Sequence, residues 1–282
     1  MRKIYDFRIL LVIVSFAVFF GTSRGVVHSG PQNETGQNGI GLCNREAVMS
    51  AAWMYCSGEY RALCYQTYNL VLKTVQDTAA FQKNVKKPLA IVVDCDETIL
   101  DNREYEVSVL YSAEKVIGKD LNKWFKKSRS EIISGAADML TKIDAMGIEI
   151  FYVSNRRKYV MKETLRNMQK LNLPQIDSNH VLLAEKESDK QARFDALQKN
   201  YSVIAYLGDS LSDFPLGLKN ASWTEACADV DKNAAAFGTK YFLLPNPLYG
   251  SWEKRLADGY YQLSPADRCE ARKKAIMQSC CQ

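Results

Sequence analysis

The sequence predicts an α/β protein, in which a Rossmann-like parallel sheet is flanked by helices and preceded by a helical appendage. Beyond Pro88, short apolar runs alternate with helical stretches, which is the pattern of βαβ units and a parallel sheet. Between Asn44 and about Gln82, in contrast, no proline occurs and apolar residues recur at helical spacing. With 282 residues, 47% of them hydrophobic, the chain is long enough for one domain with its own core.

Composition narrows the classes of function. The net charge of +5, from 37 basic and 32 acidic residues, is too mild to indicate a nucleic-acid polymer as partner. Only two histidines, His28 and His180, are present, so a His-rich metal site or a Ser-His-Asp triad has little material. The chemistry is therefore expected to rest on other side chains.

Residues 1–25 have the pattern of a signal peptide. Three basic residues within residues 1–8 precede an uncharged run at residues 9–20. A membrane-spanning helix needs about 20 apolar residues, and this run is shorter. We expect cleavage at residues 23–25 and export to the periplasm or the medium. An uncleaved signal anchor is the competing interpretation and the only membrane attachment expected.

The rest of the chain divides by composition. The expected segments are a flexible linker at 26–41, a helical segment packing on the core or cap at 42–86, a core at 87–257 with a small cap insertion at about 103–135, and a cysteine-containing tail at 258–282. Within the core, strands are expected at 89–94, 148–154, 181–183, 203–209 and 241–244, and helices at 136–146, 158–171 and 189–198.

The eight cysteines form no CxxC pair and match no zinc spacing. In an exported chain, disulfide bonds are the expected use of such residues. Cys95 directly follows an apolar strand and is expected to be a buried free thiol. Bridges are expected among the others, with one left unpaired and the connectivity open: Cys43, Cys56, Cys64, Cys227, Cys269, Cys280 and Cys281.

Polar residues follow the predicted strands at the point where each strand ends. In parallel sheets ligands bind outside the carboxyl ends of the strands, so these residues are the candidates for a site. Each one alone could be a turn or helix-cap residue, but their coincidence at one sheet edge favours a functional centre. They are Asp94 and Asp96 after the first strand, Ser154, Asn155 and Arg156 after the second, Lys190 opening the helix after the third, and Asp209 and Asp213 after the fourth.

Carboxylates with few histidines suit a hard, oxygen-seeking ion such as Mg²⁺. Such an ion offsets the repulsion between an anionic nucleophile and a phosphate, while hydroxyl, amide and ammonium groups hold the phosphoryl oxygens. An aspartate can then attack phosphorus and split the reaction into two displacements. The residue types therefore predict a phosphoryl-transfer centre.

Four ordered motifs carry a resemblance to a known family. They are Asp94–Tyr105 (DCDETILDNREY), Phe151–Arg156 (FYVSNR), Gly208–Phe214 (GDSLSDF) and Asn246–Glu253 (NPLYGSWE). The set resembles bacterial class C acid phosphatases of the haloacid dehalogenase superfamily, the DDDD phosphohydrolases, over roughly residues 44–257. The resemblance implies a haloacid dehalogenase-like fold and phosphomonoesterase activity.

The resemblance also implies roles for individual residues. Asp94 would be the nucleophile, and Asp96 the general acid and then the general base. One Mg²⁺ ion would be bound by Asp94 and Asp209, together with the backbone carbonyl of Asp96, and Asp213 would bind it either directly or through one of its ligands. The phosphate-binding residues would be Ser154, Asn155 and Lys190.

Family members usually hydrolyse small phosphomonoesters, often nucleoside 5′-monophosphates, with the base stacked between aromatic side chains. The candidates here could equally pack in the core: Tyr105, Trp124 and Tyr249. A homodimer is left open.

Three departures from the family pattern stand out: the chain lacks the lipid-accepting cysteine of many members, Cys95 replaces the usual Ile or Leu, and Ser210 replaces the usual Asn or Thr. The last two are expected to tune activity rather than abolish it. The preferred interpretation is an exported, Mg²⁺-dependent acid phosphatase. The alternatives are a non-catalytic storage or binding member of the fold, and a phosphotransferase that uses an alcohol acceptor.

Overall fold

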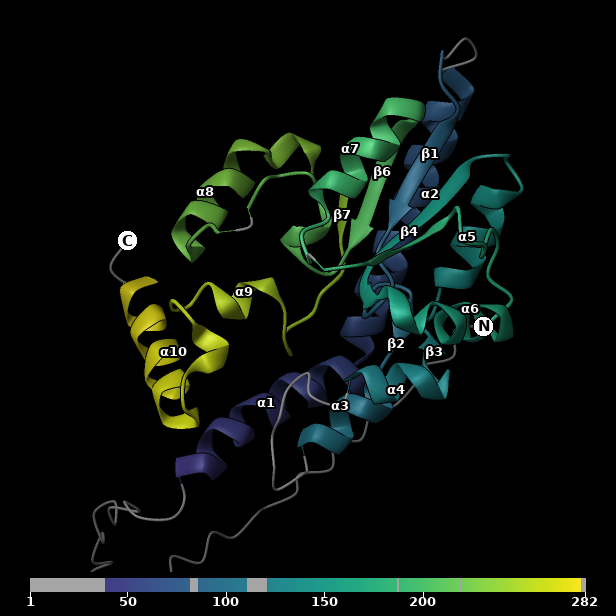
Figure 1. The fold of residues 1–282 in the computed structure, drawn as a ribbon. Helices are drawn as coiled ribbons and strands as arrows, with labels where there is room; N and C mark the ends of the chain where they lie inside the picture. Colours follow the sequence, from purple (N-terminus) through teal and green to yellow (C-terminus); the bar gives the residue numbers. More distant parts are fainter. Residues whose placement is uncertain (1–38, 82–85, 111–120, 187, 219, 280–282) are drawn as a thin grey trace, which may run out of the picture. The chain divides into compact units, whose positions relative to one another are not determined.

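The computed structural model describes residues 39–81, 86–110, 121–186, 188–218 and 220–279 (Figure 1). The predicted signal peptide and most of the predicted linker lie outside these residues. Among the described residues, no helix is long and apolar enough to cross a membrane.

A five-stranded parallel sheet, ordered β5-β4-β1-β6-β7, forms the centre of the fold. Its strands are β1 (Leu89–Val93), β4 (Glu149–Arg157), β5 (Val181–Ala184), β6 (Ser202–Gly208) and β7 (Tyr241–Leu243). The predicted parallel sheet is thereby confirmed. β4 continues to Arg157, three residues beyond the expected end.

Helices and a small second sheet accompany the central sheet. The second sheet pairs β2 (Leu100–Asp101) with β3 (Glu131–Ile132) in antiparallel fashion, and helices lie between these strands in the chain. The helices are α1 (Gly39–Cys56), α2 (Gly58–Phe81), α3 (Arg103–Leu110), α4 (Leu121–Lys127), α5 (Ala136–Asp144), α6 (Met161–Lys170), α7 (Gln191–Asn200), α8 (Trp223–Lys232), α9 (Ser251–Lys254) and α10 (Pro265–Ser279). The expected cap insertion, at about 103–135, contains α3, α4 and β3, and residues 111–120 within it are not among those described.

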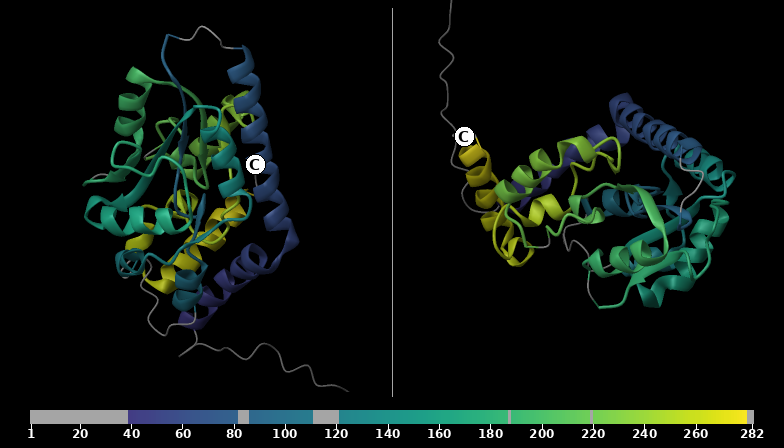
Figure 2. Two further views of the ribbon diagram at one scale, coloured as in Figure 1. Left: turned by 90° about the vertical axis from the view of Figure 1, so that its right-hand side faces the viewer. Right: turned by 90° about the horizontal axis from the view of Figure 1, so that it is seen from above.

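Both faces of the sheet are covered, as the alternation of side chains in a strand requires. Ile91 and Val93 of β1 pack in the cluster that contains α2 and α5, whereas Ala90 and Val92 pack in the cluster of Phe194 on α7. Figure 1 shows α2 behind the sheet and α7 in front of it, and Figure 2 shows α5 beside α2. The strands are buried on both sides, which explains their continuous apolar runs.

The amino-terminal helices support the loop that follows β1. The hydroxyl of Tyr68 on α2 donates a hydrogen bond of 2.7 Å to the carbonyl of Thr98. Helix α1 packs against α3 and α10. The predicted helical appendage is therefore part of the structure that holds the strand-end loops in place.

The cysteines depart from the prediction in part. Cys95 is buried with a free thiol, as expected, and burial raises the pKa of that thiol. Cys56, Cys64 and Cys227 are also free thiols, so the bridges expected at these three are absent. Cys64 faces Tyr60 inside the helical layer instead of another thiol, and the other two are exposed. The side chains of residues 43, 280 and 281 lie outside the described part.

Candidate active site

Three of the predicted carboxylates meet at the carboxyl edge of the sheet. Asp94 follows β1, and its N–H donates to the carbonyl of Leu207 on β6, at 2.8 Å. Asp209 follows β6, and Asp213 ends the short 3₁₀ turn at Leu211–Asp213. One carboxylate oxygen from each of the three aspartates lies within 4.8 Å of the others. Parallel strands thus bring together residues more than 100 positions apart.

A glycine makes this close approach feasible. A Cβ atom on Gly208 would overlap the side chain of Asp213, whose Oδ2 would lie 2.5 Å from it. The N–H of Ser210 donates to that same oxygen at 2.9 Å. A side chain at position 208 would therefore displace the carboxylate of Asp213.

Lys190 neutralises part of this cluster. Its ammonium contacts Oδ1 of Asp94 and lies 2.7 Å from Oδ1 of Asp213, and its side chain is buried. Burial lowers the pKa of Lys190, but the two carboxylates outweigh burial and raise the pKa above its usual value. Burial raises the pKa of Asp94 to about 7, with Lys190 opposing this effect. Burial also raises the pKa of Asp209, and the charges of Asp213 and Asp94 add to the increase.

The cluster suits a divalent cation. With all three carboxylates ionised, one ammonium would leave two negative charges uncompensated in a largely buried space, and the raised pKa values of Asp94 and Asp209 reflect this repulsion and burial. The donors are all hard oxygens, which are the ligands that Mg²⁺ prefers. Two neutral side chains hold the acceptors in place: Thr98 Oγ1 lies 3.3 Å from oxygens of both Asp94 and Asp209, and Asn246 donates to Asp209 at 2.8 Å.

The side chain of Asp96 points away from these three carboxylates and toward Arg156. This side chain does not join the carboxylate cluster but is held by the guanidinium of Arg156, with Nη2 2.7 Å from Oδ1. The buried hydroxyl of Ser154 lies 3.5 Å from Oδ2 of Asp96. Ser154 and Asp96 are therefore brought together, as predicted from their positions after neighbouring strands.

Asn155 lies at the outer side of this edge. Its side chain is exposed, and its Oδ1 accepts a hydrogen bond of 2.9 Å from Arg193. Arg193 also donates to the carbonyl of Ser154 at 2.6 Å. The structure thus uses Asn155 and Arg193 to fix the end of β4.

The loop between β1 and β2 is closed by a buried acid. Glu97 has a φ of 54°, in the left-handed region, and is almost completely buried. It accepts hydrogen bonds from the backbone N–H of Asn102, at 3.2 Å, and from the hydroxyl of Tyr249. Burial raises the pKa of Glu97, and the charge of Asp96 adds to the increase. Glu97 thus ties the first motif to the fourth.

The three candidate stacking residues lie in different surroundings. Tyr105 and Trp124 are buried, with ring centroids 6.4 Å apart, and pack with Phe125 in a small core of their own. Tyr249 is half-buried and engages Glu97. The packing interpretation is therefore sufficient for the first two rings.

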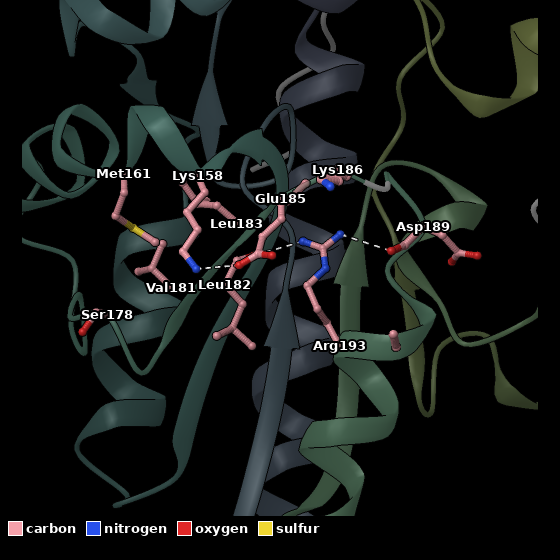
Figure 3. A pocket seen from close by; sticks show the side chains of 12 residues that line it. Lys158, Met161, Ser178, Val181, Leu182, Leu183, Glu185, Lys186, Asp189 and Arg193 are labelled. Atoms are coloured by element: carbon pink, nitrogen blue, oxygen red, sulfur yellow. Dashed lines mark hydrogen bonds and ion pairs between the residues drawn. The ribbon is translucent and has the colours of Figure 1, made fainter.

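A pocket of about 500 Å³ runs along the free edge of β5 (Figure 3). Lys158 and Glu185 form an ion pair of 2.6 Å at its rim. The guanidinium of Arg193 reaches the carbonyl of Leu182 at 3.0 Å. None of the three clustered carboxylates lines this pocket, so it is a feature beside the site rather than its centre.

Several residues of the site had no role predicted from the sequence, although Arg156 was expected at this edge of the sheet. Thr98, Asn102, Arg156 and Asn246 lie inside the motifs that carry the family resemblance, so their positions were visible in the sequence. Their hydrogen-bond partners were not, because these partners depend on how separate loops meet. Arg193 lies outside those motifs, and no sequence pattern indicated that it would contact the site.

A parallel α/β sheet with clustered strand-end carboxylates beside a buried lysine defines a hydrolase of the haloacid dehalogenase type. The chain belongs to the acid phosphatases of subfamily IIIB of the HAD superfamily, whose model matches residues 33–252.

Solved structures agree with this assignment. The chain is similar to the class C acid phosphatase from Bacillus anthracis, with 30% identity and a TM-score of 0.78, over 82% of this chain and 97% of that one. A tungstate-bound structure of the Bacillus anthracis enzyme matches with 31% identity and a TM-score of 0.75, over 83% and 97% of the two chains. The protein is therefore a phosphomonoesterase, and the predicted resemblance is confirmed.

Proposed function

We propose that this acid phosphatase hydrolyses small phosphomonoesters through an aspartyl-phosphate on Asp94. The observation that carries the proposal is the placement of Asp94. Its carboxylate is held by Lys190 and has the oxygens of Asp209 and Asp213 within 4.8 Å. A fixed carboxylate beside a cation-binding cluster is the arrangement that an in-line attack on phosphorus requires.

The reaction takes two displacements. In the first, an oxygen of Asp94 bonds to phosphorus as the ester P–O bond breaks, and Asp96 gives its proton to the departing oxygen. In the second, water attacks the same phosphorus and gives a proton to Asp96, while the bond to Asp94 breaks. The products are an alcohol and inorganic phosphate, and both aspartates return to their starting states.

The phosphoryl oxygens need donors that do not themselves react. Lys190 lies beside Asp94, and the buried hydroxyl of Ser154 faces Asp96, so both are within the region where a phosphoryl group must sit. We assign them, with Asn155 at the end of the same strand, to phosphate binding.

The cation assigned to the cluster is Mg²⁺, held by Asp94, Asp209 and Asp213 with the backbone carbonyl of Asp96. When bound, this ion supplies positive charge that offsets the repulsion between the carboxylate and the phosphate. The two uncompensated negative charges of the cluster support this choice.

Substrate and location complete the proposal. Nucleoside 5′-monophosphates are the proposed substrates, with Tyr249 as the stacking ring because it is the least buried of the three candidates. We further propose export by the signal at residues 1–25, with disulfide bonds confined to cysteines outside the described thiols. Mass measurement of the secreted chain tests the cleavage, and thiol titration tests the bridges.

The activity is tested by hydrolysis of a nucleoside monophosphate and a generic aryl phosphate, with Mg²⁺ or EDTA, by the wild type and Asp94→Asn. We expect the wild type to lose its activity in EDTA and the variant to be inactive in both. Full activity of the variant, or indifference to EDTA, would refute the mechanism. Adding an alcohol acceptor and measuring phosphorylated acceptor against inorganic phosphate separates hydrolysis from transfer.

A further inference from the structure

Arg156 is a fully buried charge with an unusual number of contacts to one acid. Its side chain has no exposed surface. Nε lies 3.1 Å from Oδ1 and 3.0 Å from Oδ2 of Asp96, and Nη2 lies 2.7 Å from Oδ1. A planar guanidinium bound in this way restricts the carboxylate in rotation as well as in position.

The guanidinium is itself held from three sides. The ring of Phe125 on α4 lies under it, with the guanidinium carbon 4.0 Å from the ring centroid. Thr164 on α6 accepts from Nη1 at 3.4 Å, and Ser130 accepts from Nη2 at 3.3 Å. Arg156 is therefore anchored by α4, α6 and the segment leading to β3.

Asn102 makes a second hold on the same acid. Its Nδ2 donates to Oδ1 of Asp96 at 2.8 Å. The amide orientation is fixed because its Oδ1 accepts from the indole N–H of Trp124, at 2.8 Å, and from Ser130, at 2.7 Å. Two adjacent residues of α4, Trp124 and Phe125, thus support the two residues that hold Asp96.

The two oxygens of Asp96 differ as a result. Oδ1 accepts from Nη2 of Arg156 and from Asn102 and shares the Nε–H of Arg156 with Oδ2, whereas Oδ2 otherwise accepts, among the described residues, only a long hydrogen bond of 3.5 Å from the hydroxyl of Ser154. A carboxylate oxygen has about two acceptor sites, so those of Oδ1 are filled by Arg156 Nη2 and Asn102, and Oδ2 keeps the weaker partner. Oδ2 is the oxygen that points toward the proposed phosphate-binding hydroxyl.

We propose that Arg156 is a positioning residue that, with Asn102, anchors Oδ1 of Asp96 and leaves Oδ2 to exchange protons with the leaving group and the attacking water. Helix α4 maintains this arrangement through Phe125 and Trp124. The inference rests on the proposed role of Asp96 as general acid and base. It also gives the buried aromatic residues of α4 a role other than stacking on substrate.

The test compares two esters that differ in their need for an acid. An alkyl phosphate requires protonation of its leaving oxygen, whereas a dinitrophenyl phosphate does not. For R156Q we expect kcat/KM, which reports the first displacement, to fall about 100-fold with the alkyl ester and less than about 10-fold with the aryl ester. Asn102→Ala should show the same difference between the esters to a smaller degree. In the double variant, kcat/KM with the alkyl ester should fall by less than the product of the two single-variant losses.

An equal loss with both esters, or no loss with either, would overturn the inference. R156K keeps the charge but not the bidentate contact, so its kcat/KM should also fall more with the alkyl ester than with the aryl ester. R156K therefore provides the same measurement if R156Q folds poorly. The matched control is Arg129→Gln, which removes an exposed ion pair with Glu104 from the same segment and should leave both kcat/KM values unchanged.

Asp96→Asn distinguishes a failure of the proposed acid role of Asp96 from a failure of the proposed positioning role of Arg156. If kcat/KM of this variant falls equally with both esters, the proposed function of Asp96 as acid is wrong. If it loses the alkyl ester selectively but R156Q and R156K do not, the inference about Arg156 alone is wrong.

Discussion

Replacing Lys190 with methionine should destabilise the protein strongly when no divalent cation is present. Methionine keeps the length of the side chain but removes the charge. In the wild type this buried ammonium contacts Asp94 and lies 2.7 Å from Asp213. The substitution leaves those carboxylates together in a buried site without their cation.

The expected size follows from this geometry. Breaking a buried ion pair by removing one partner costs about 3–5 kcal/mol of unfolding free energy. At roughly 2–4 °C per kcal/mol for a chain of this size, the unfolding midpoint should fall by about 6–20 °C. The measurement is made at a pH above 7, because burial raises the pKa of Asp94 to about 7 and the carboxylate must be ionised.

Thermal unfolding in EDTA and in Mg²⁺ provides the assay. The fall in the unfolding midpoint of K190M should be largest in EDTA and smaller in Mg²⁺. A cation bound only by the folded state stabilises it, and the cation should bind more tightly once the ammonium no longer contacts the carboxylates. Adding Asp213→Asn should recover part of the loss, because the pair is coupled. A fall of less than about 2 °C in EDTA would refute the claim that Lys190 balances the carboxylate cluster.

Two further predictions concern other positions. Gly208→Ala should lower kcat about 100-fold, because the new Cβ would displace Asp213, and steady-state kinetics with a circular-dichroism check of folding would detect it. His180→Gln should cost about 1 kcal/mol at acidic pH, since the partly exposed pairs of His180 with Glu149 and Asp177, each 2.9 Å, are weak. Burial lowers the pKa of His180, but these carboxylates outweigh burial and raise it above 6.5. The stabilisation is therefore complete well below pH 6.5 and disappears as the pH rises through the raised pKa. Urea unfolding across that range should show the difference closing, and a constant difference would contradict it.

The fold was largely predictable because its strands are buried on both faces. Such strands appear as unbroken apolar runs, and a run of this kind ends where the polar site begins, as Val93 gives way to Asp94. The same rule located Ser154 and Asp209, whereas Lys190 was located as the residue that opens the next helix. The end of β4 was missed because Asn155, Arg156 and Arg157 are polar residues that continue the strand into the site.

The contacts within the site were much less predictable. Arg156 and Asp96 are 60 residues apart, and no spacing rule connects them. The sequence placed the guanidinium of Arg156 at this edge of the sheet, but a fully buried arginine is rare, and nothing in the sequence indicated which acid it would hold. The cysteine prediction was also partly wrong, because spacing and compartment say nothing about which thiols face each other.

The central claim is that Asp94 becomes phosphorylated during turnover. The most direct measurement is acid quenching of the enzyme with a radiolabelled phosphomonoester, followed by peptide mapping. We expect a phosphoryl group on the carboxylate of Asp94 in the wild type and none in Asp94→Asn. A label on another residue would contradict the account. So would steady turnover of a labelled dinitrophenyl phosphate, which needs no acid in the first step, without any labelled protein when dephosphorylation is slowed by Asp96→Asn.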